Sequence, residues 1–313
     1  MIIISDTTQF HIDAPTAVAI GKFDGIHSGH VKLLNHILDY AVENAERGVK
    51  TAVFTFNMSA AKFFGDKDIK EVTTLSEKRL IFEEMGIDYL LEFPLNEKTA
   101  AIEATDFVNE IVLGMMNAEY IAAGEDVSFG YKGRGDAKLL LSLSDNQKKF
   151  KVDIIDKLLY EGRDISSTFV REEIAKGHME VVSELLGHPY AFAGEVATGF
   201  KLGRKMGFPT MNLYPDPEKI LPPLGVYYSN VIYEDANYPG ITNIGIRPTV
   251  KNEADDHISV ETYLFDFDKD MYGKQITTEL IKFKRGEVKF DSVQELKQAI
   301  AQDICEGREF FGC

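Results

Sequence analysis

The periodicity of apolar residues changes once along the chain, near residue 187, and this change constrains the fold most. Before it, short β-rich runs alternate with longer amphipathic stretches, as in a parallel sheet with crossover helices. After it, short strand-like runs are separated by glycine, proline, asparagine and aspartate, which is typical of an antiparallel barrel or sandwich. A chain of 313 residues can bury two such cores. We therefore predict two domains, 1–186 and 187–313.

The expected elements follow from this periodicity. In the first domain the strands are Ala17–Ile20, Thr51–Phe56, Tyr89–Phe93, Tyr120–Ala123 and Val152–Ile155, and the helices are Val31–Glu46, Glu77–Met85, Ala104–Leu113 and Ala137–Lys148. Right-handed crossovers then give a doubly wound α/β sheet. In the second domain the strands are Phe192–Ala197, Val226–Tyr233, Ile241–Ile246, Ile258–Phe265 and Ile276–Phe283, followed by an amphipathic helix at about Val293–Asp303.

Charge and cysteine content restrict the partners and the compartment. The formal net charge of -16 argues against nucleic acid or an anionic membrane, because both demand a basic face. Only Cys305 and Cys313 occur, too close together in sequence to staple the fold, which fits a reducing compartment. No apolar run is long enough for a signal peptide or a membrane span. We expect a soluble, cytoplasmic protein with small-molecule substrates and no nucleic-acid or membrane partner.

The first candidate site follows the strand Ala17–Ile20, where the chain reads G-K-F-D-G-I-H-S-G-H over Gly21–His30. A doubly wound sheet binds phosphate at such a point, since glycine lets the backbone approach and the helix N-terminus offers free N–H groups. His27 and His30 are three residues apart, so both imidazoles can donate to the same phosphate oxygens. The alternative is that the two histidines merely cap the helix.

A second polar segment, Ile165–Arg171 (I-S-S-T-F-V-R), stands at the start of another expected helix. Adjacent hydroxyls at a helix N-terminus, with an arginine one turn later, can hold the β- and γ-phosphates of ATP as they leave. Serine and threonine also cap helices routinely, so an ordinary N-cap beside a surface arginine is the alternative.

The two segments together resemble the nucleotidyltransferases that share the H-x-G-H signature. More closely, the first domain resembles the FMN adenylyltransferase module of bacterial bifunctional riboflavin kinase/FMN adenylyltransferases, also called FAD synthetases. This resemblance implies a Rossmann-like fold. It also implies that the FMN phosphate attacks the α-phosphorus of ATP directly, so that pyrophosphate leaves without a covalent enzyme intermediate.

The resemblance assigns roles residue by residue. It implies that His27 and His30 bind the ATP phosphates and stabilise the transition state, while Arg171, together with Ser167 and Thr168, holds the leaving pyrophosphate. The full set of ATP-binding residues expected in this domain also includes Gly21, Phe23, Asp24 and Gly29.

A flavin site is implied by the segment Gly124–Gly130 (G-E-D-V-S-F-G), which gives Asp126 the flavin phosphate. An exposed carboxylate in a turn is the alternative. The chain departs from the common family pattern at Ser28, at Asn57–Ser59 and at Val127. The roles of Asn57 and Asp126 are therefore left open.

The second domain carries a glycine-rich basic run from Gly194 to Asn212. Its glycines permit a loop to fold over a nucleotide, its basic residues supply positive charge and its proline stiffens the exit. The residues expected at ATP are Gly203, Arg204, Gly207 and Pro209. Thr210 and Asn212 then alternate onto one face, where two neutral oxygens can hold Mg²⁺ against ATP phosphates. An ordinary hairpin is the alternative.

Later segments resemble, in order, the riboflavin kinase module of the same family. These segments are Pro222–Tyr227, Asn243–Thr249, Val260–Thr262, Asp270–Gly273 and Arg285–Phe290, and Val250 stands where an aromatic is frequent. The resemblance therefore covers nearly the whole chain, and it implies a six-stranded antiparallel barrel with a C-terminal helix. It makes Glu261 the general base for the riboflavin 5′-hydroxyl and gives Arg285 to the flavin. Without it, Glu261 is an exposed strand glutamate.

The implied function is a bifunctional enzyme that phosphorylates riboflavin with ATP and adenylylates the resulting FMN to FAD. Two other functions remain open on the residues alone. One is a flavin-sensing regulatory protein with a residual nucleotidyltransferase domain, against which the joint presence of Thr210, Asn212 and Glu261 speaks. The other is a fragment of a class I aminoacyl-tRNA synthetase, which the acidic balance disfavours.

Overall fold

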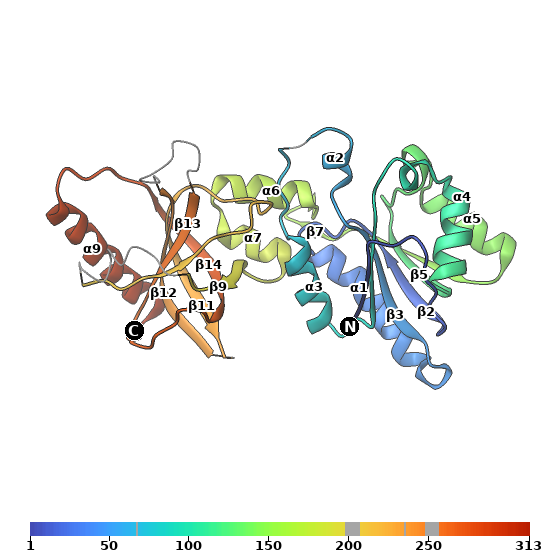
Figure 1. Cartoon of the computed structure of the whole chain (residues 1–313), viewed down its shortest axis with the longest axis horizontal. Coiled ribbons are helices and arrows are strands. Elements are labelled where there is room, and N and C mark those ends of the chain that lie inside the picture. Colours follow the sequence, from blue (N-terminus) through green and yellow to red (C-terminus); the bar gives the residue numbers. More distant parts are fainter. Residues whose placement is uncertain (67, 198–206, 235, 248–256) are drawn as a thin grey trace. The chain divides into compact units, whose positions relative to one another are not determined.

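The structure is a computed structural model, and it describes residues 1–66, 68–197, 207–234, 236–247 and 257–313. By internal contacts the chain divides into two compact units, Met1–Ser167 and Thr168–Cys313 (Figure 1). The first unit is an α/β sheet and the second is an antiparallel β structure, as the change in apolar periodicity predicts.

The first unit alternates strands and helices. Its strands are β1 (Ile2–Ser5), β2 (Thr16–Ile20), β3 (Lys50–Phe56), β4 (Tyr89–Phe93), β5 (Ala118–Gly124) and β6 (Lys151–Ile155), with a small hairpin of β7 (Leu159–Tyr160) and β8 (Arg163–Asp164). Its helices are α1 (Ser28–Glu43), α2 (Ala60–Phe63), α3 (Leu75–Glu84), α4 (Ala104–Asp106), the π-helical η3 (Phe107–Met115) and α5 (Ala137–Gln147), and α6 (Ser167–Lys176) begins at its last residue. Short 3₁₀ turns lie at η1 (Ala45–Arg47), η2 (Thr99–Ala101) and η4 (Tyr131–Gly133).

The six main strands form one parallel sheet in the order β1-β4-β3-β2-β5-β6. The chain leaves β2 toward β3 on one side and later returns to β5 on the other, so the carboxyl end of β2 is the topological switch point. Ligands bind at this point in open α/β sheets. The doubly wound fold expected from the sequence is confirmed.

Alternating side chains of β2 serve two cores, one on each face of the sheet. Ala17 and Ala19 belong to a cluster that includes α1 and α3 residues, whereas Val18 and Ile20 belong to a cluster with η3 and α5. All five residues of β2 are buried, as expected for a central parallel strand covered on both faces. The sheet therefore holds the end of β2 rigidly.

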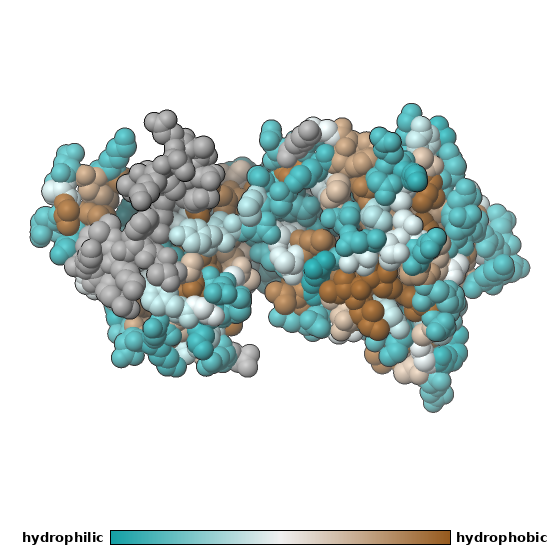
Figure 2. Space-filling model, viewed as in Figure 1, coloured by the Kyte–Doolittle hydropathy of each residue, from teal (hydrophilic) through white to brown (hydrophobic). Residues whose placement is uncertain are grey.

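Two features of the first unit were not expected from the sequence. The run Ile2–Ser5 forms the edge strand β1, which is too short to show a clear period. Ile2 and Ile3 are exposed there, and Figure 2 shows a hydrophobic patch near the N-terminus on an otherwise mostly hydrophilic face. The predicted helix Ala104–Leu113 is present, but most of it is π-helical.

The second unit is a six-stranded antiparallel sheet in the order β10-β13-β12-β11-β14-β9. Its elements are α7 (Met179–Leu186), β9 (Tyr190–Glu195), β10 (Met211–Leu213), β11 (Gly225–Tyr233), β12 (Ala236–Arg247), β13 (His257–Leu264), β14 (Gln275–Gly286) and α9 (Val293–Phe311). An antiparallel bridge between Ala197 and Asn212 links the chain beyond β9 to β10, so the two edges of the sheet approach each other. The predicted six-stranded barrel fold with its C-terminal helix is confirmed.

Helices cover this sheet at two places. Helix α9 packs on β12, and Tyr228 of the neighbouring strand β11 stacks on Phe310 of α9 with ring centroids 4.4 Å apart. Helix α7 packs on β14 and β9. At one contact the backbones of β11 and β14 come so close that only glycine fits, since a Cβ at Gly225 would lie 2.2 Å from the Arg285 carbonyl oxygen. Among the described residues, no helix is long and apolar enough to cross a membrane.

The packing of α7 leads to a prediction about truncation. Met179, Val182, Leu185 and Leu186 of α7 are buried, and burying each such side chain contributes about 1.5–3 kcal/mol. We expect the fragment 168–313 to unfold cooperatively with a Tm at least about 10 °C above that of the fragment 187–313, because each kcal/mol is worth a few degrees. Circular dichroism melts of both fragments make the measurement, and equal melting temperatures would contradict it. Division of the two activities at 186/187 stays a prediction.

Candidate active sites

The segment between β2 and α1 has an unusual backbone. Phe23, Gly25 and Ile26 have φ of 49°, 91° and 39°, in the left-handed region that a β-branched residue rarely adopts. The side chains of Phe23 and Ile26 are buried, so core packing holds the chain in this conformation. Such strain persists where the surroundings over-determine it, which is common at functional sites.

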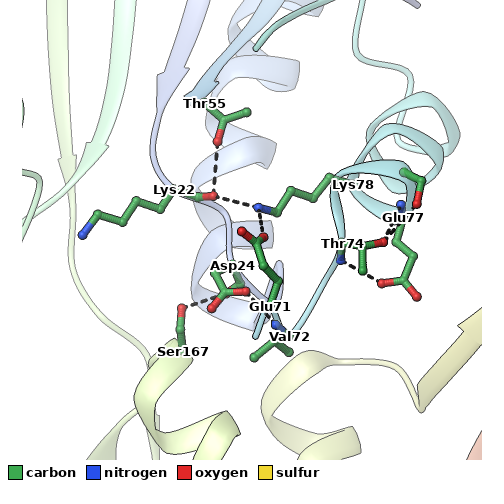
Figure 3. Close-up of polar contacts among 10 residues, drawn as sticks. Lys22, Asp24, Thr55, Glu71, Val72, Thr74, Glu77, Lys78 and Ser167 are labelled. Carbon is green, nitrogen blue, oxygen red and sulfur yellow. Dashed lines mark hydrogen bonds and ion pairs between the residues drawn. The ribbon is translucent and has the colours of Figure 1, made fainter. Parts of the chain in front are cut away.

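Hydrogen bonds from three distant segments fix the same loop (Figure 3). The Thr55 hydroxyl donates to the Lys22 carbonyl oxygen at 3.2 Å. The Val72 N–H donates to Asp24 Oδ1 at 2.8 Å, and the Ser167 hydroxyl donates to the Asp24 carbonyl oxygen at 2.7 Å. Asp24, which the sequence predicts to bind ATP, thus joins the loop to Val72 and Ser167.

His27 and His30 stack on each other, with ring centroids 3.8 Å apart and planes inclined by 20°. His27 precedes α1, yet its side chain makes no capping hydrogen bond within the described chain. The buried Nδ1 atoms of both rings also lack a hydrogen-bond partner among the described residues. A Cβ at Gly29 would lie 3.2 Å from the His27 ring, so this position needs glycine or some yielding of the ring. The helix-cap alternative is therefore disfavoured.

Burial keeps both histidines neutral at neutral pH. It lowers the pKa of His27 to about 4, although the carboxylates of Asp24 and Asp126 act in the opposite direction. The pKa of His30 lies well below its usual value because of burial, with His27 and the Lys78 ammonium adding to the effect. A neutral imidazole offers one N–H donor and one acceptor. Each ring can therefore give one hydrogen bond to a phosphate oxygen, with no full charge.

The structure brings together part of the predicted first site. Ser167, at the start of α6, reaches the loop through Asp24. Thr168 and Arg171 follow on α6 and belong to the second unit, so their binding to phosphate stays a prediction. Gly21 packs under the Phe23 ring, where a Cβ would lie 3.0 Å from the nearest ring carbon.

Asp126 and Asn57 have defined contacts. The Asp126 carboxylate is mostly exposed and pairs with the Lys157 ammonium at 3.3 Å. Its charge acts on His27, so it belongs to the same electrostatic environment. Asn57 accepts a hydrogen bond from the Leu95 N–H at 3.0 Å, which fixes the chain after β4.

The second candidate site lies on three neighbouring strands. Asn212 on β10 is opposite Glu261 on β13, and Glu261 is opposite Asn243 on β12. Residues opposite each other in a sheet point to the same face, so the three polar side chains form one row. The Ser259 hydroxyl donates to Glu261 Oε1 at 3.3 Å. Asn243 was not singled out from the sequence, because only strand register reveals its place beside Glu261.

The other residues expected in this half are partly described. Thr210 directly precedes β10, with Pro209 before it and Gly207 at a φ of 92°. Gly203 and Arg204 lie outside the described residues. The Arg285 guanidinium is held by Asp303 of α9, through Nε–Oδ1 at 3.1 Å and Nη2–Oδ2 at 2.6 Å. Lys284 also pairs with Asp303.

Family models match both halves of the chain. A model described as FAD synthetase matches residues 9–169, and one described as riboflavin kinase matches residues 186–311. Proteins named bifunctional riboflavin kinase/FMN adenylyltransferase are similar over almost the full length. The one from Bacillus subtilis is 33% identical, covering 95% of this chain and 93% of the relative. The one from Escherichia coli K12 is 36% identical, covering 94% and 92%.

A solved structure supports the fold of the whole chain. A crystal structure of a protein named macrolide-efflux protein, from Streptococcus pneumoniae, matches with a TM-score of 0.81 at 28% sequence identity. The match covers 96% of each chain.

The buried histidines give a prediction about protonation. In an NMR titration of protein with ¹³C-labelled histidine, we expect the His27 ring to titrate with a midpoint near 4 rather than 6.5. Adding tripolyphosphate should raise this midpoint, because an anion favours the protonated ring. His27→Asn identifies the resonance. A midpoint near 6.5, or one that tripolyphosphate does not move, would contradict an anion site at this ring.

Proposed function

This chain belongs to the family of bifunctional riboflavin kinase/FMN adenylyltransferases, and from that premise we propose which residues carry each of its two reactions. The second half is a riboflavin kinase, which makes FMN and ADP from riboflavin and ATP. The first half is an FMN adenylyltransferase, which makes FAD and pyrophosphate from FMN and a second ATP. The observation that supports this function is that the FAD synthetase model and the riboflavin kinase model match consecutive parts of the chain. Both match an enzyme, and neither favours a flavin-sensing regulator.

The adenylylation site is assigned to the loop Gly21–His27 and the start of α1. An FMN phosphate oxygen attacks the α-phosphorus of ATP, a new P–O bond forms, and the bond to the β-phosphate bridging oxygen breaks with its electron pair leaving on pyrophosphate. The neutral rings of His27 and His30 donate N–H groups to the phosphate oxygens, where negative charge increases in the transition state. The N–H groups of the loop and the helix start add further donors.

The leaving pyrophosphate is assigned to the start of α6. The Ser167 hydroxyl hydrogen is already donated to the Asp24 carbonyl, so its backbone N–H is the better phosphate donor. Thr168 and Arg171 supply a hydroxyl and a guanidinium within the next turn. The guanidinium suits a pyrophosphate because its planar donors match two phosphate oxygens. Asp126 is assigned to the flavin side of this site.

The kinase site is assigned to the row of Asn212, Glu261 and Asn243. The Glu261 carboxylate takes the proton of the riboflavin 5′-hydroxyl as the hydroxyl oxygen forms a bond to the γ-phosphorus. The bond from the γ-phosphorus to the β–γ bridging oxygen breaks, and its electron pair leaves on ADP. Asn212 is 4% exposed and directly opposite Glu261, which suits an oxygen ligand fixed beside the reacting groups. Arg285 is assigned to the flavin, with its orientation set by Asp303.

Magnesium fits this donor set. Thr210 and Asn212 offer neutral oxygens, and Mg²⁺ takes few protein ligands while its other positions go to phosphates and water. Among the described residues no group of three or more His, Cys, Asp or Glu could hold a metal by itself. When bound, Mg²⁺ offsets the negative charge of the ATP phosphates. Gly203, Arg204, Gly207 and Pro209 are assigned to the loop around them, and we place the protein in the cytoplasm, where ATP is supplied.

The role of His30 gives the first activity prediction. His30→Ala should lower FAD formation from FMN by about 10²–10³-fold, because a donor aimed at developing charge is removed. Riboflavin phosphorylation by the same protein should stay within about twofold of wild type. Chromatographic separation of riboflavin, FMN and FAD over time measures both steps. His36→Ala, on the same helix with an exposed side chain, is the matched control. A loss below about threefold in His30→Ala would rule out the assigned role.

The role of Glu261 gives the converse prediction. Glu261→Gln keeps the side-chain shape but removes the base, so FMN formation from riboflavin should fall by roughly 10²–10⁴-fold. Added FMN should still be converted to FAD at the wild-type rate. Glu195→Gln on β9, outside the polar row, is the control and should retain both activities. Survival of kinase activity in Glu261→Gln would make Glu261 structural.

A further inference from the structure

A buried ion pair stands beside the adenylylation loop and has no role in the chemistry assigned above. Lys78 on α3 pairs with Glu71, with Nζ 2.9 Å from Oε2. The Lys78 side chain is 6% exposed and that of Glu71 is 16% exposed. Neither residue was singled out from the sequence, because their proximity depends on how the chain before α3 folds back.

Lys78 also reaches the loop itself. Its ammonium donates to the Lys22 carbonyl oxygen at 3.4 Å, and the same oxygen also accepts from the Thr55 hydroxyl (Figure 3). Figure 3 shows the Lys22 side chain pointing away, so the contact is to the backbone alone. Next to Glu71, the Val72 N–H donates to Asp24. The segment 71–78 therefore holds the strained loop at two points, Lys22 and Asp24.

The direction of the Lys78 side chain is set by the start of its helix. Thr74 caps α3, and Thr74 and Glu77 form a reciprocal capping box. The Lys78 N–H then donates to the Thr74 carbonyl oxygen at 2.9 Å in the first turn. The Lys78 side chain is thus fixed at the backbone by the helix and at Nζ by two hydrogen bonds, so it has little conformational freedom.

The energetics favour a functional reason for this pair. Burying two charges is expensive, and replacing a buried ion pair by apolar residues is often neutral or stabilising. The site must bind a polyphosphate in a protein of net charge -16, and its two histidines are neutral. The Lys78 charge acts on His30, where it disfavours the protonated ring. Lys78 supplies a fixed positive charge beside the loop, in addition to the guanidinium that Arg171 is proposed to contribute to the pyrophosphate.

We propose that Lys78, oriented by Glu71, is a positioning residue of the adenylylation site, which holds the Lys22 carbonyl and presents the Gly21–His27 loop to ATP. The proposal rests on the function proposed above for this loop. Lys78 acts through the loop backbone and through its charge, and does not touch the substrate. Glu71 holds the ammonium in place by accepting a second of its three N–H donors.

The test compares two ion pairs on adjacent residues of α3. Arg79 pairs with Glu92, which is fully buried, through Nε–Oε1 at 2.7 Å and Nη2–Oε2 at 2.6 Å, and this pair does not contact the loop within the described chain. In the full-length protein, K78M/E71L should lower kcat/KM for FAD formation about 10- to 100-fold, the size of a lost charged hydrogen bond. The matched variant R79M/E92L should stay within about threefold, and kinase activity should stay within twofold in both.

A charge swap separates positioning from stability. K78E/E71K retains an ion pair but puts a carboxylate, which cannot donate to a carbonyl, at position 78. We expect its Tm to recover toward wild type while FAD formation remains at least 10-fold low. Hydrogen–deuterium exchange of peptides covering residues 21–30 should speed up in both Lys78 variants and not in R79M/E92L. If K78M/E71L fails to fold, the activity and exchange rates of K78E/E71K decide whether Lys78 positions the loop.

The outcomes are distinct. Wild-type FAD formation and loop protection in K78M/E71L, or full rescue of activity by the charge swap, would overturn the positioning role while leaving the function of the histidines intact. Full activity of His30→Ala would instead overturn the proposed function of the loop. Loss of activity in both Lys78 variants, with faster exchange confined to the loop, supports the inference.

Discussion

The first candidate site depends on a backbone whose strained conformation is held by its surroundings. Three of four consecutive residues after Lys22 have positive φ, and one of them is isoleucine. The side chains of Phe23 and Ile26 anchor the loop because they are buried in the core. Hydrogen bonds from residues 55, 72, 78 and 167 to the loop hold it further. The sheet supports all of this, because β2 is buried on both faces. Strain here is offset by packing contributed from the whole domain.

The first candidate site has a local signal in the sequence. A strand that runs into glycines and a helix start is a contiguous pattern, so the sequence alone predicts phosphate binding at Gly21–His30. The roles of Asp24 and Lys78 could not be predicted, because they depend on contacts 48 and 56 residues away in sequence. The lowered pKa of His27 could not be predicted from the sequence either, since it results from burial in the folded domain.

In the fold, too, elements with a local sequence period were predicted and elements without one were not. Long central strands and amphipathic helices were predicted because each carries its own period. Two boundaries were wrong, since β12 begins at Ala236 rather than Ile241 and α9 continues to Phe311 rather than ending near Asp303. The edge strands β1 and β10 were missed, since four and three residues are too few for an alternation to appear. In the second half, Glu261 could be proposed only through resemblance. The strand register shows that Glu261 lies between Asn212 and Asn243 in one row of polar side chains.

The two halves meet the same electrostatic demand in different ways. Both must bind ATP in a chain of net charge -16, so neither can depend on a broad basic surface. In the roles proposed above, the first half binds ATP through backbone N–H groups, neutral imidazoles and one buried cation. The proposed site of the second half has neutral oxygens beside a carboxylate, a donor set that would suit a magnesium ion bound to the nucleotide. Preorganised donors suit attack at the α-phosphorus, where no alcohol has to be deprotonated, because the FMN phosphate is already an anion. Attack by a neutral hydroxyl at the γ-phosphorus needs a base, and the kinase site proposed for the second half has one in the carboxylate of Glu261.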